Sequence, residues 1–249
     1  MHIAICSDIH GNRHAFEAVI AAAEAADAEE LWCLGDLVGY GGDPDDCVRL
    51  AADHCTSCLA GNHDLAVIDV LSLSDFSRGA ALAAQWTKET IQPETRDYLA
   101  SLEPQGAVGS IGLYHASPRD PVWEYVLSTL TAELCLDATT YRVSMIGHSH
   151  VALAFTRPDG EPATGATRRA GEEADLSTGE WLVNPGSTGQ PRGSPSRELA
   201  DARHRRLDGH LAARGVRHRG RHGVHPRGSA ARFAGGAPPT WSVRRIAPY

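Results

Sequence analysis

Four short clusters of metal-binding residue types follow one another along the chain, each beside a glycine or after an apolar stretch. They are Asp8-Ile9-His10, Gly35-Asp36, Gly61-Asn62-His63-Asp64 and Gly147-His148-Ser149-His150, with His115 between the last two. Oxygen and imidazole ligands of this kind suit hard or borderline divalent cations. Polar side chains at the carboxyl ends of neighbouring strands converge on one crevice. The ordered set therefore predicts a fold whose strand ends meet around a metal site.

The first half of the chain alternates strand and helix patterns. Residues 2–6 predict a buried strand, the Ala-rich residues 15–26 a helix, and residues 31–34 a second strand. The second strand ends at Gly35-Asp36, so this opening is a β-α-β unit with polar side chains at its strand ends. Further elements are predicted at residues 46–54 (helix), 56–60 (strand), 76–89 (helix) and 93–101 (helix).

The second half places strands more nearly in succession. They are predicted at residues 107–116, as a strand or hairpin that carries His115, and at residues 141–146, 151–157 and 181–183. A short helix is predicted to begin near Thr131. Parallel β-α-β units followed by successive strands predict two sheets packed face to face with helices outside. We therefore expect an α/β fold, a four-layer α-β-β-α sandwich of two mixed sheets with a dimetal site at strand ends. The tryptophans assigned to its core are Trp32, Trp86, Trp123 and Trp181.

The composition fits a globular protein without membrane spans. Hydrophobic residues make up 42% of the 249 residues, which allows a sizeable core. The chain starts without a basic region, and no apolar stretch in it has the length of a transmembrane helix. The six cysteines lie mostly within apolar stretches, which favours buried thiols in a reducing compartment over disulfides. We therefore expect a cytoplasmic protein.

Residues 193–249 differ in composition from residues 1–192. They are rich in Arg, Gly, Ala, His and Pro, contain no Lys, and carry a net positive charge although the whole chain carries −8. Only Trp241–Ile246 has a strand pattern. A genuine arm of this kind would bind nucleic acid or an anionic surface through phosphate contacts, yet it has few aromatic residues and no nucleic-acid motif.

An alternative explanation is a reading-frame shift near Arg192 in a GC-rich gene, because such a message read out of frame yields Arg, Ala, Gly, Pro and His. We favour this explanation, or a disordered extension, because the composition cannot bury enough apolar surface to fold. The prediction is one domain over residues 1–192 and an atypical, disordered or frameshifted tail over residues 193–249.

The clusters hold enough ligands for two metal ions. Asp8 and His10 stand two residues apart just past a predicted strand, so both can turn toward one ion. Asp36 follows a neighbouring strand, and its two oxygens can bridge two cations roughly 3.5–4 Å apart. The remaining candidates are the amide oxygen of Asn62 and the imidazoles of His115, His148 and His150. Any one of these residues would usually be structural, but the ordered set predicts a dinuclear site.

These clusters resemble the calcineurin-like metallophosphoesterase superfamily, in its small bacterial and archaeal branch. Three longer segments add to the resemblance, which covers residues 1 to about 192: Ser7-Asp8-Ile9-His10-Gly11-Asn12, His115-Ala116-Ser117-Pro118-Arg119-Asp120 and Asn184-Pro185-Gly186-Ser187. The resemblance implies one metal held by Asp8, His10, Asp36 and His150, and a second held by Asp36, Asn62, His115 and His148. Family members carry Mn, Fe, Zn, Ni or Co, and Mn is our first choice for the two divalent ions.

The resemblance also implies a reaction. It predicts hydrolysis of phosphate mono- or diesters by direct attack of a metal-bridging hydroxide, without a covalent enzyme intermediate. His63 would donate a proton to the leaving group or contact the transition state, with Asp64 orienting its ring. The expected partner is a small phosphate-ester substrate, with neither a membrane nor a stable nucleic-acid partner. The physiological substrate and the oligomeric state stay open.

Other functions remain open within and beyond this chemistry. The same fold serves protein Ser/Thr phosphatases and diadenosine tetraphosphate hydrolases. A non-catalytic interaction scaffold, or a nucleic-acid-binding module that uses the basic tail, is the alternative from another class. Scaffold members lose ligands or the catalytic histidine, whereas all seven ligand positions and His63 are present here. The intact set therefore favours an enzyme.

Three neighbouring residues are candidates for substrate binding. Asn12 and Arg13 follow the first cluster, and Arg119 follows His115. Either arginine could contact a substrate phosphate. An arginine on a loop is more often simply solvated, so both functions stay open at this point.

Overall fold

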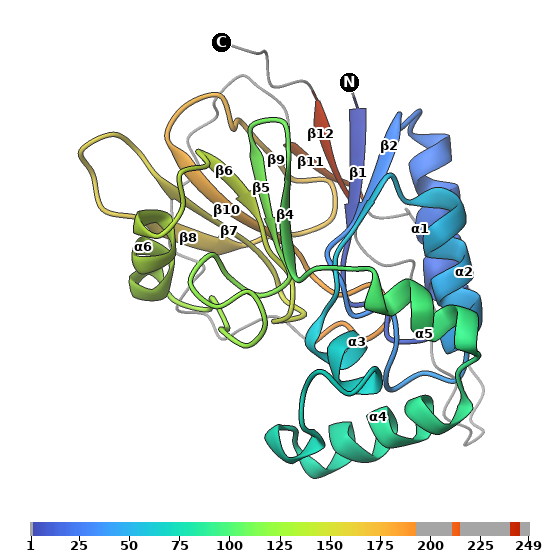
Figure 1. Ribbon diagram of the computed structural model, residues 1–249. Coiled ribbons are helices and arrows are strands. Elements are labelled where there is room, and N and C mark those ends of the chain that lie inside the picture. Colours follow the sequence, from blue (N-terminus) through green and yellow to red (C-terminus); the bar gives the residue numbers. More distant parts are fainter. Residues whose placement is uncertain (1, 193–210, 215–239, 245–249) are drawn as a thin grey trace, which may run out of the picture.

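The structure is a computed structural model that describes residues 2–192, 211–214 and 240–244. It contains two six-stranded mixed sheets, and the predicted four-layer α/β sandwich is confirmed (Figure 1). The first sheet has the order β3-β2-β1-β12-β11-β9, and the second has the order β4-β5-β6-β10-β7-β8. Both sheets combine parallel and antiparallel pairs.

The first sheet is parallel where the metal-binding clusters begin. Its strands are β1 (His2–Cys6), β2 (Glu30–Cys33), β3 (Ser57–Cys58), β9 (Glu173–Ala174), β11 (Leu211–Arg214) and β12 (Thr240–Arg244). Strands β1, β2 and β3 run parallel, with Cys6 opposite Cys33 and Cys33 opposite Cys58. The carboxyl ends of β1 and β2 therefore lie side by side.

The second sheet brings the remaining clusters to the same end of the molecule. Its strands are β4 (Gln105–Val108), β5 (Ile111–Tyr114), β6 (Val143–Met145), β7 (Ala152–Arg157), β8 (Thr164–Thr167) and β10 (Glu180–Pro185). Strand β6 lies parallel to both β5 and β10, and the other pairs are antiparallel. His115 follows β5 and His148 follows β6, so the two histidines leave neighbouring parallel strands.

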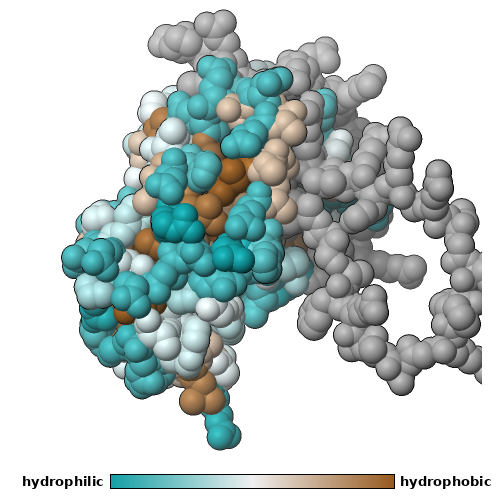
Figure 2. All heavy atoms as spheres, turned by 90° about the vertical axis from the view of Figure 1, so that its right-hand side faces the viewer, coloured by the Kyte–Doolittle hydropathy of each residue, from teal (hydrophilic) through white to brown (hydrophobic). Residues whose placement is uncertain are grey.

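Helices cover the outer face of each sheet. They are α1 (Arg13–Ala25), α2 (Pro44–His54), α3 (Asn62–Val67), α4 (Arg78–Thr90), α5 (Pro93–Ala100) and α6 (Thr129–Asp137), with a 3-10 helix, η1, at Leu73–Asp75. In Figure 1, α1 and α2 lie outside the first sheet and α6 lies outside the second. Figure 2 shows the face with α1 and α2: hydrophilic side chains cover most of it around one larger apolar area and a few small ones.

Apolar contacts separate into three layers that match this order. The central layer joins the two sheets through residues such as Ile5, Trp32, Leu113, Met145 and Trp181. A second layer joins the first sheet to α1, α2 and α5, and a third joins the second sheet to α6. Burial of this apolar surface is what fixes the two sheets against each other.

Helix α1 shows how the sequence specifies one of these contacts. The Asn12 side chain accepts a hydrogen bond from the amide of Ala15 (3.1 Å) and so caps the helix. Phe16, Val19, Ile20 and Ala23 are buried, at the spacing of one helical face. The helix therefore packs this face onto the sheet directly after the loop that carries Asp8 and His10.

The structure corrects the sequence-based elements in a few places. The helix predicted over residues 76–89 starts only at Arg78, because the Ser77 side chain caps it by accepting from the Ala80 amide. Phe76 therefore lies before the helix. The assignment of Trp86 to the core is wrong, since it is 45% exposed on α4. Short strands β8 and β9, and helix α3, were not predicted.

The tail prediction is tested only where residues are described. Strand β12 pairs antiparallel with β1, and β11 lies between β12 and β9. Strand β12 overlaps Trp241–Ile246. The rest of residues 193–249 lies outside the described residues, so the predicted boundary at residue 192 and the frameshifted or disordered tail stay predictions. Within the described part of the chain, no helix is long and apolar enough to cross a membrane.

Candidate metal centre

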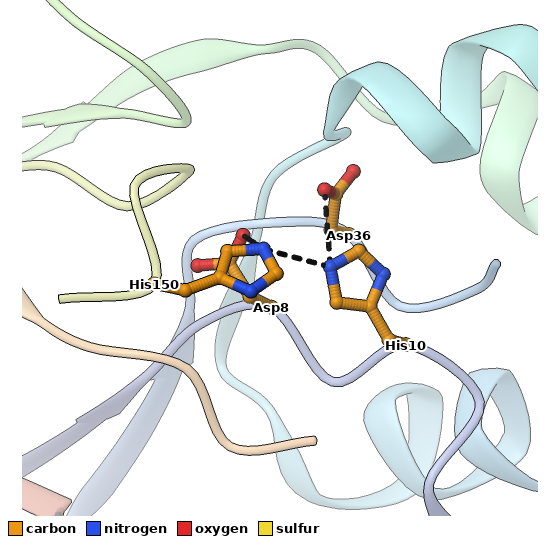
Figure 3. Close-up of side chains that lie close together, drawn as sticks. All are labelled: Asp8, His10, Asp36 and His150. Atoms are coloured by element: carbon orange, nitrogen blue, oxygen red, sulfur yellow. Dashed lines mark hydrogen bonds and ion pairs between the residues drawn. The ribbon is translucent and has the colours of Figure 1, made fainter. Parts of the chain in front are cut away.

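The predicted ligands meet at the carboxyl ends of strands from both sheets. Asp8 and His10 follow β1, Asp36 follows β2, and Asn62 begins α3 after β3; His115 follows β5, and His148 and His150 follow β6. We call these seven residues the ligand cluster. All seven are buried, none more than 4% exposed. Figure 3 shows Asp8, His10, Asp36 and His150 pointing toward one another from three loops, of which one carries both Asp8 and His10.

The backbone of the ligand cluster is strained. Eight described residues other than glycine have positive φ, and six of them lie at this centre: Asp8, His10, Asp36, Tyr40, His148 and His150. Left-handed backbone costs a residue with a side chain roughly 1–3 kcal/mol when the surroundings enforce it. Sharp turns at the strand ends aim these side chains inward, and this concentration of strain is typical of a functional site.

The first group of ligand atoms brings two imidazoles face to face. Asp8, His10, Asp36 and His150 offer atoms that all lie within 4.8 Å of one another. His10 Nδ1 donates to the Val38 carbonyl oxygen (3.1 Å), and His150 Nδ1 donates to that of Gln190 (2.7 Å). The two Nε2 atoms are only 3.0 Å apart. When both rings are neutral, lone pair faces lone pair, and a cation between them removes that repulsion.

The second group has the same character. Asp36, His115 and His148 also offer atoms within 4.8 Å of one another. His115 Nδ1 donates to the Leu34 carbonyl oxygen (2.9 Å), which turns its Nε2 toward Asn62 Oδ1 at 3.2 Å. The buried Nε2 of His148 has no hydrogen-bond partner among the described residues. Several atoms with free electron pairs therefore face one another, and no N–H or O–H group of the described residues lies between them to form a hydrogen bond.

Asp36 belongs to both groups. Its Oδ1 accepts a hydrogen bond from the backbone amide of His63 (2.8 Å). Its Oδ2 lies 3.6 Å from His10 Nε2 and 3.7 Å from His115 Nε2. One carboxylate oxygen thus lies between the two sets of ligand atoms, where a bridging ligand would have to be.

Burial and charge favour the protonation states that a cation needs at two of the histidines and at Asp8, but they favour the protonated form of Asp36 until a cation binds. Burial, together with neighbouring histidine charges, lowers the pKa of His148 to about 3 and that of His10 well below its usual value. Burial opposes ionisation of Asp8, but the hydrogen bond and charge of His150 lower its pKa below the usual range. Burial and the charge of Asp8 raise the pKa of Asp36. Neutral imidazoles and buried carboxylates form a donor set that fits divalent metal ions.

His63 lies beside the ligand cluster without belonging to either ligand group. Its ring centroid is 4.9 Å from that of His10. Its Nδ1 is buried without a hydrogen-bond partner in the described chain and packs against Gly39. Burial and nearby positive charges lower the pKa of His63 to about 3. A Cβ at Gly39, where φ is +85°, would lie 2.4 Å from His63 Nδ1, so only glycine leaves room for the ring.

Asp64 shapes the loops around His63. Its carboxylate accepts from the backbone amides of Leu37 (3.2 Å), Val38 (3.0 Å) and Gly61 (2.8 Å). Burial and the charge of Asp36 raise its pKa to about 8, against the effect of these three hydrogen bonds. None of its hydrogen bonds reaches the His63 ring. Asp64 therefore positions the backbone that carries Val38 and Asn62 rather than the imidazole directly.

The three predicted substrate-binding residues all have other partners. Asn12 caps α1 and donates to the Gly189 carbonyl oxygen (3.1 Å). Arg13 pairs with Asp46 (3.1 Å), and Arg119 pairs with Glu124 (3.2 Å). Their assignment to substrate stays a prediction, and the structure supplies each with a structural contact instead.

Five residues that the sequence did not assign to the site surround it. Tyr40, Phe76, Trp123 and Tyr125, which we call the aromatic rim, each make a ring contact with a histidine of the centre or with one another. The core assignment of Trp123 is wrong, since it is only partly buried beside the site. The positive charge of Arg192 contributes to the low pKa of His63. Of these five residues, only Tyr40 could have been found from the sequence, because it lies four residues after the predicted ligand Asp36.

Comparisons with known proteins agree with this geometry. The family model described as the calcineurin-like phosphoesterase superfamily domain matches residues 1–203. An uncharacterized protein of Methanocaldococcus jannaschii is 34% identical over 206 residues, which covers 76% of this chain and 77% of that protein.

Two solved structures share the fold. A metallophosphoesterase from Sphaerobacter thermophilus is 34% identical, with a TM-score of 0.68 over 86% of this chain and 82% of that one. A hypothetical protein from Pyrococcus horikoshii is 19% identical, with a TM-score of 0.59 over 85% and 82% of the two chains. The second likeness concerns the fold alone.

Proposed function

This chain belongs to the calcineurin-like phosphoesterase superfamily, and on that basis we propose that it hydrolyses phosphate mono- or diesters with two divalent metal ions. The observation that carries the proposal is the set of buried acceptors that face one another. The Nε2 atoms of His10 and His150 are 3.0 Å apart, and His115 Nε2 is 3.2 Å from Asn62 Oδ1. Cations at these two points would turn repulsive pairs into ligand sets.

The proposed ligands follow from the two groups. Asp8, His10, Asp36 and His150 would hold one metal, and Asp36, Asn62, His115 and His148 the other. When bound, such ions lower the pKa of a water molecule and neutralise negative charge on phosphoryl oxygens. We propose Mn first, with Fe, Zn, Ni and Co as alternatives, because nitrogen and oxygen donors of this kind serve all of them.

The chain itself supplies a proton and positive charge. His63 Nδ1 is buried against Gly39, so we assign the proton transfer to the leaving oxygen to its Nε2. Because the pKa of His63 is lowered to about 3, this role requires the negative charge of a bound phosphate to stabilise the protonated ring. The Asp36 carboxylate fixes the His63 backbone, and Asp64 fixes the surrounding loops. Arg192 adds a cation near His63 that can neutralise charge on a bound phosphate.

We also propose where the enzyme acts and on what kind of substrate. We propose a cytoplasmic enzyme that acts on a small phosphate ester and has neither a membrane nor a stable nucleic-acid partner. A protein Ser/Thr phosphatase or a diadenosine tetraphosphate hydrolase would use the same centre. A non-catalytic scaffold would not need the buried Asp and His groups that converge here.

A metal and substrate screen tests the proposal. We expect metal-free protein to be inactive and Mn²⁺-loaded protein to bind about two ions per chain. The loaded protein should hydrolyse bis-p-nitrophenyl phosphate or p-nitrophenyl phosphate, measured by nitrophenolate release. Protein that binds two ions but stays inert on a broad panel of phosphate esters, with each candidate metal, would establish the scaffold alternative. Protein that binds no metal would overturn the dinuclear site itself.

A further inference from the structure

The aromatic rim forms a connected series of rings around the centre. The ring centroids of Tyr40 and His63 are 4.7 Å apart, those of His63 and Phe76 5.1 Å, and those of Phe76 and Trp123 5.0 Å. The series continues to the proposed ligand His148, which is 6.4 Å from Trp123 and 4.3 Å from Tyr125. Side chains from three separate loops therefore meet within a few ångströms of the proposed metals.

Most rings of the aromatic rim contact the histidines edge-on and do not stack flat on them. Phe76 is inclined at 78° to His63, and Trp123 at 78° to His148. Tyr125 alone stacks flat on a histidine, at 15° to His148, and it is 46% exposed. Tyr40, Phe76 and Trp123 are each partly exposed. Aromatic surface left open beside convergent polar groups is typical of a ligand-binding site rather than a core.

The loop that carries two of these rings is held in shape. Glu124 accepts from Ser117 Oγ (2.6 Å) and pairs with Arg119 (3.2 Å). Val126 is buried in the core under α6. Trp123 and Tyr125, two residues apart, both make ring contacts with His148. Glu124 and Val126 alternate with them and are turned to the Ser117 hydroxyl and to the core, respectively. The chain thus uses buried contacts to present two aromatic rings to the site.

We propose that the aromatic rim is a subsite for an aromatic group of the substrate, so that the preferred esters carry a planar ring close to the scissile bond. The inference rests on the proposed function and adds its substrate class. Stacking on an aromatic side chain contributes roughly 1–3 kcal/mol per planar ring, which corresponds to about 5- to 150-fold in affinity. An aryl ester and a nucleotide share this chemistry, and the experiment distinguishes them.

Matched substrate pairs separate ring binding from leaving-group reactivity. Benzyl phosphate is compared with cyclohexylmethyl phosphate, and thymidine 5′-phosphate with ribose 5-phosphate, each as monoester and as methyl diester. Within a pair the leaving alkoxides are alike and only one member carries an aromatic ring. We expect the Mn²⁺-loaded protein to favour the aromatic member by about 10-fold or more in kcat/KM. A preference in the benzyl pair identifies an aryl ester, and one in the nucleotide pair a nucleobase.

Variants connect that preference to the rim. Trp123→Ala and Tyr125→Ala should lower kcat/KM for the aromatic member of each pair, so that the ratio of the two kcat/KM values moves toward 1. Trp123→Phe should keep most of the preference for the aromatic member. Trp86→Ala removes a more exposed tryptophan, on α4 and outside the rim, and should leave the ratio unchanged. Thermal unfolding of each variant identifies general loss of structure.

Two results would overturn the subsite. The first is equal kcat/KM for both members of each pair. The second is a Trp123→Ala variant that lowers both members equally, since the rings would then only position the histidines. In either case the proposed hydrolase function stands. A metal-loaded protein that hydrolyses none of these esters nor bis-p-nitrophenyl phosphate overturns that function and the subsite together.

Discussion

The ligand cluster and the aromatic rim lie within a few ångströms of each other but differ in how the chain builds them. The ligands follow the ends of strands and are at most 4% exposed. Hydrogen bonds with the backbone of Val38, His63 and Leu34 hold His10, Asp36 and His115, respectively. The rim comes from loops, and Tyr125 is 46% exposed. A buried cluster of fixed geometry can define one reaction, while an open rim can change without disturbing it. If both proposals hold, residues of the ligand cluster would determine the reaction and residues of the aromatic rim would determine the preferred substrate.

The largest expected effect comes from removing the shared carboxylate. Asp36→Ala deletes the oxygen between the two ligand groups and the acceptor for the His63 amide. We expect loss of bound metal and a fall in kcat on the order of 10³-fold or more, because metals contribute several kcal/mol of transition-state stabilisation. Metal analysis and ester hydrolysis measure this. Asp159→Ala, at an exposed turn, is the control. Full activity in Asp36→Ala would remove the basis for a dinuclear site.

The next effect separates proton transfer from metal binding. His63→Ala should lower kcat by roughly 10²–10⁴-fold while the metal content stays at the wild-type level, because His63 belongs to neither ligand group. The loss should be smaller for esters with acidic leaving groups, which need less protonation. If metal is lost in parallel with activity, His63 is a ligand and its assignment as proton donor is wrong.

A backbone change tests how tightly the pocket holds His63. Gly39→Ala places a methyl group 2.4 Å from His63 Nδ1 at a φ of +85°, so the ring must move. We expect a loss of about 1–2 kcal/mol in unfolding free energy from the left-handed backbone, and a clear drop in kcat. Gly42→Ala is the matched control, because nothing lies within 4 Å of its added Cβ. Equal behaviour of the two variants would show that the position of His63 is not limiting.

The smallest effect concerns support beneath the ligand cluster. Asn12→Ala removes the cap of α1 and should cost about 1 kcal/mol, or a fall in Tm of about 2–4 °C, with KM unchanged. Asn12→Asp keeps the cap and loses only the hydrogen bond to the Gly189 carbonyl oxygen, so its Tm should lie between those of Asn12→Ala and the wild type. A raised KM at unchanged Tm would instead assign Asn12 to substrate binding.

The sequence predicted the ligand cluster better than the rim for a physical reason. Metal ligands must be of a few residue types, which are easily recognised in a sequence. Asp8, Asp36 and His148 also follow short apolar strands whose pattern is clear. Phe76 fits the helical period that follows it, and only the Ser77 cap, which depends on local hydrogen bonds, releases it from the helix. Trp123 has no periodic pattern around it, so the core was the natural assignment.

The fold shows the same division. Strands with continuous apolar runs, such as β1 and β2, were predicted, whereas β8 and β9 consist of small and polar residues and are defined by their pairing partners. The left-handed backbone of Asp8, His10 and Asp36 was also beyond prediction, because surrounding loops rather than residue preference enforce it.

The two oxygens of Asp36 make different contacts. Oδ2 faces both ligand groups, and Oδ1 accepts a hydrogen bond from the backbone amide of His63. If metals bind as proposed, a shift of this carboxylate toward or away from one of them would also move the start of α3, and with it His63, the proposed proton donor. In the proposed enzyme, metal occupancy and the position of His63 would then be coupled through the side chain of Asp36. A half-loaded protein would accordingly lose both charge stabilisation and proton transfer, so its activity should rise with metal concentration more steeply than either site fills.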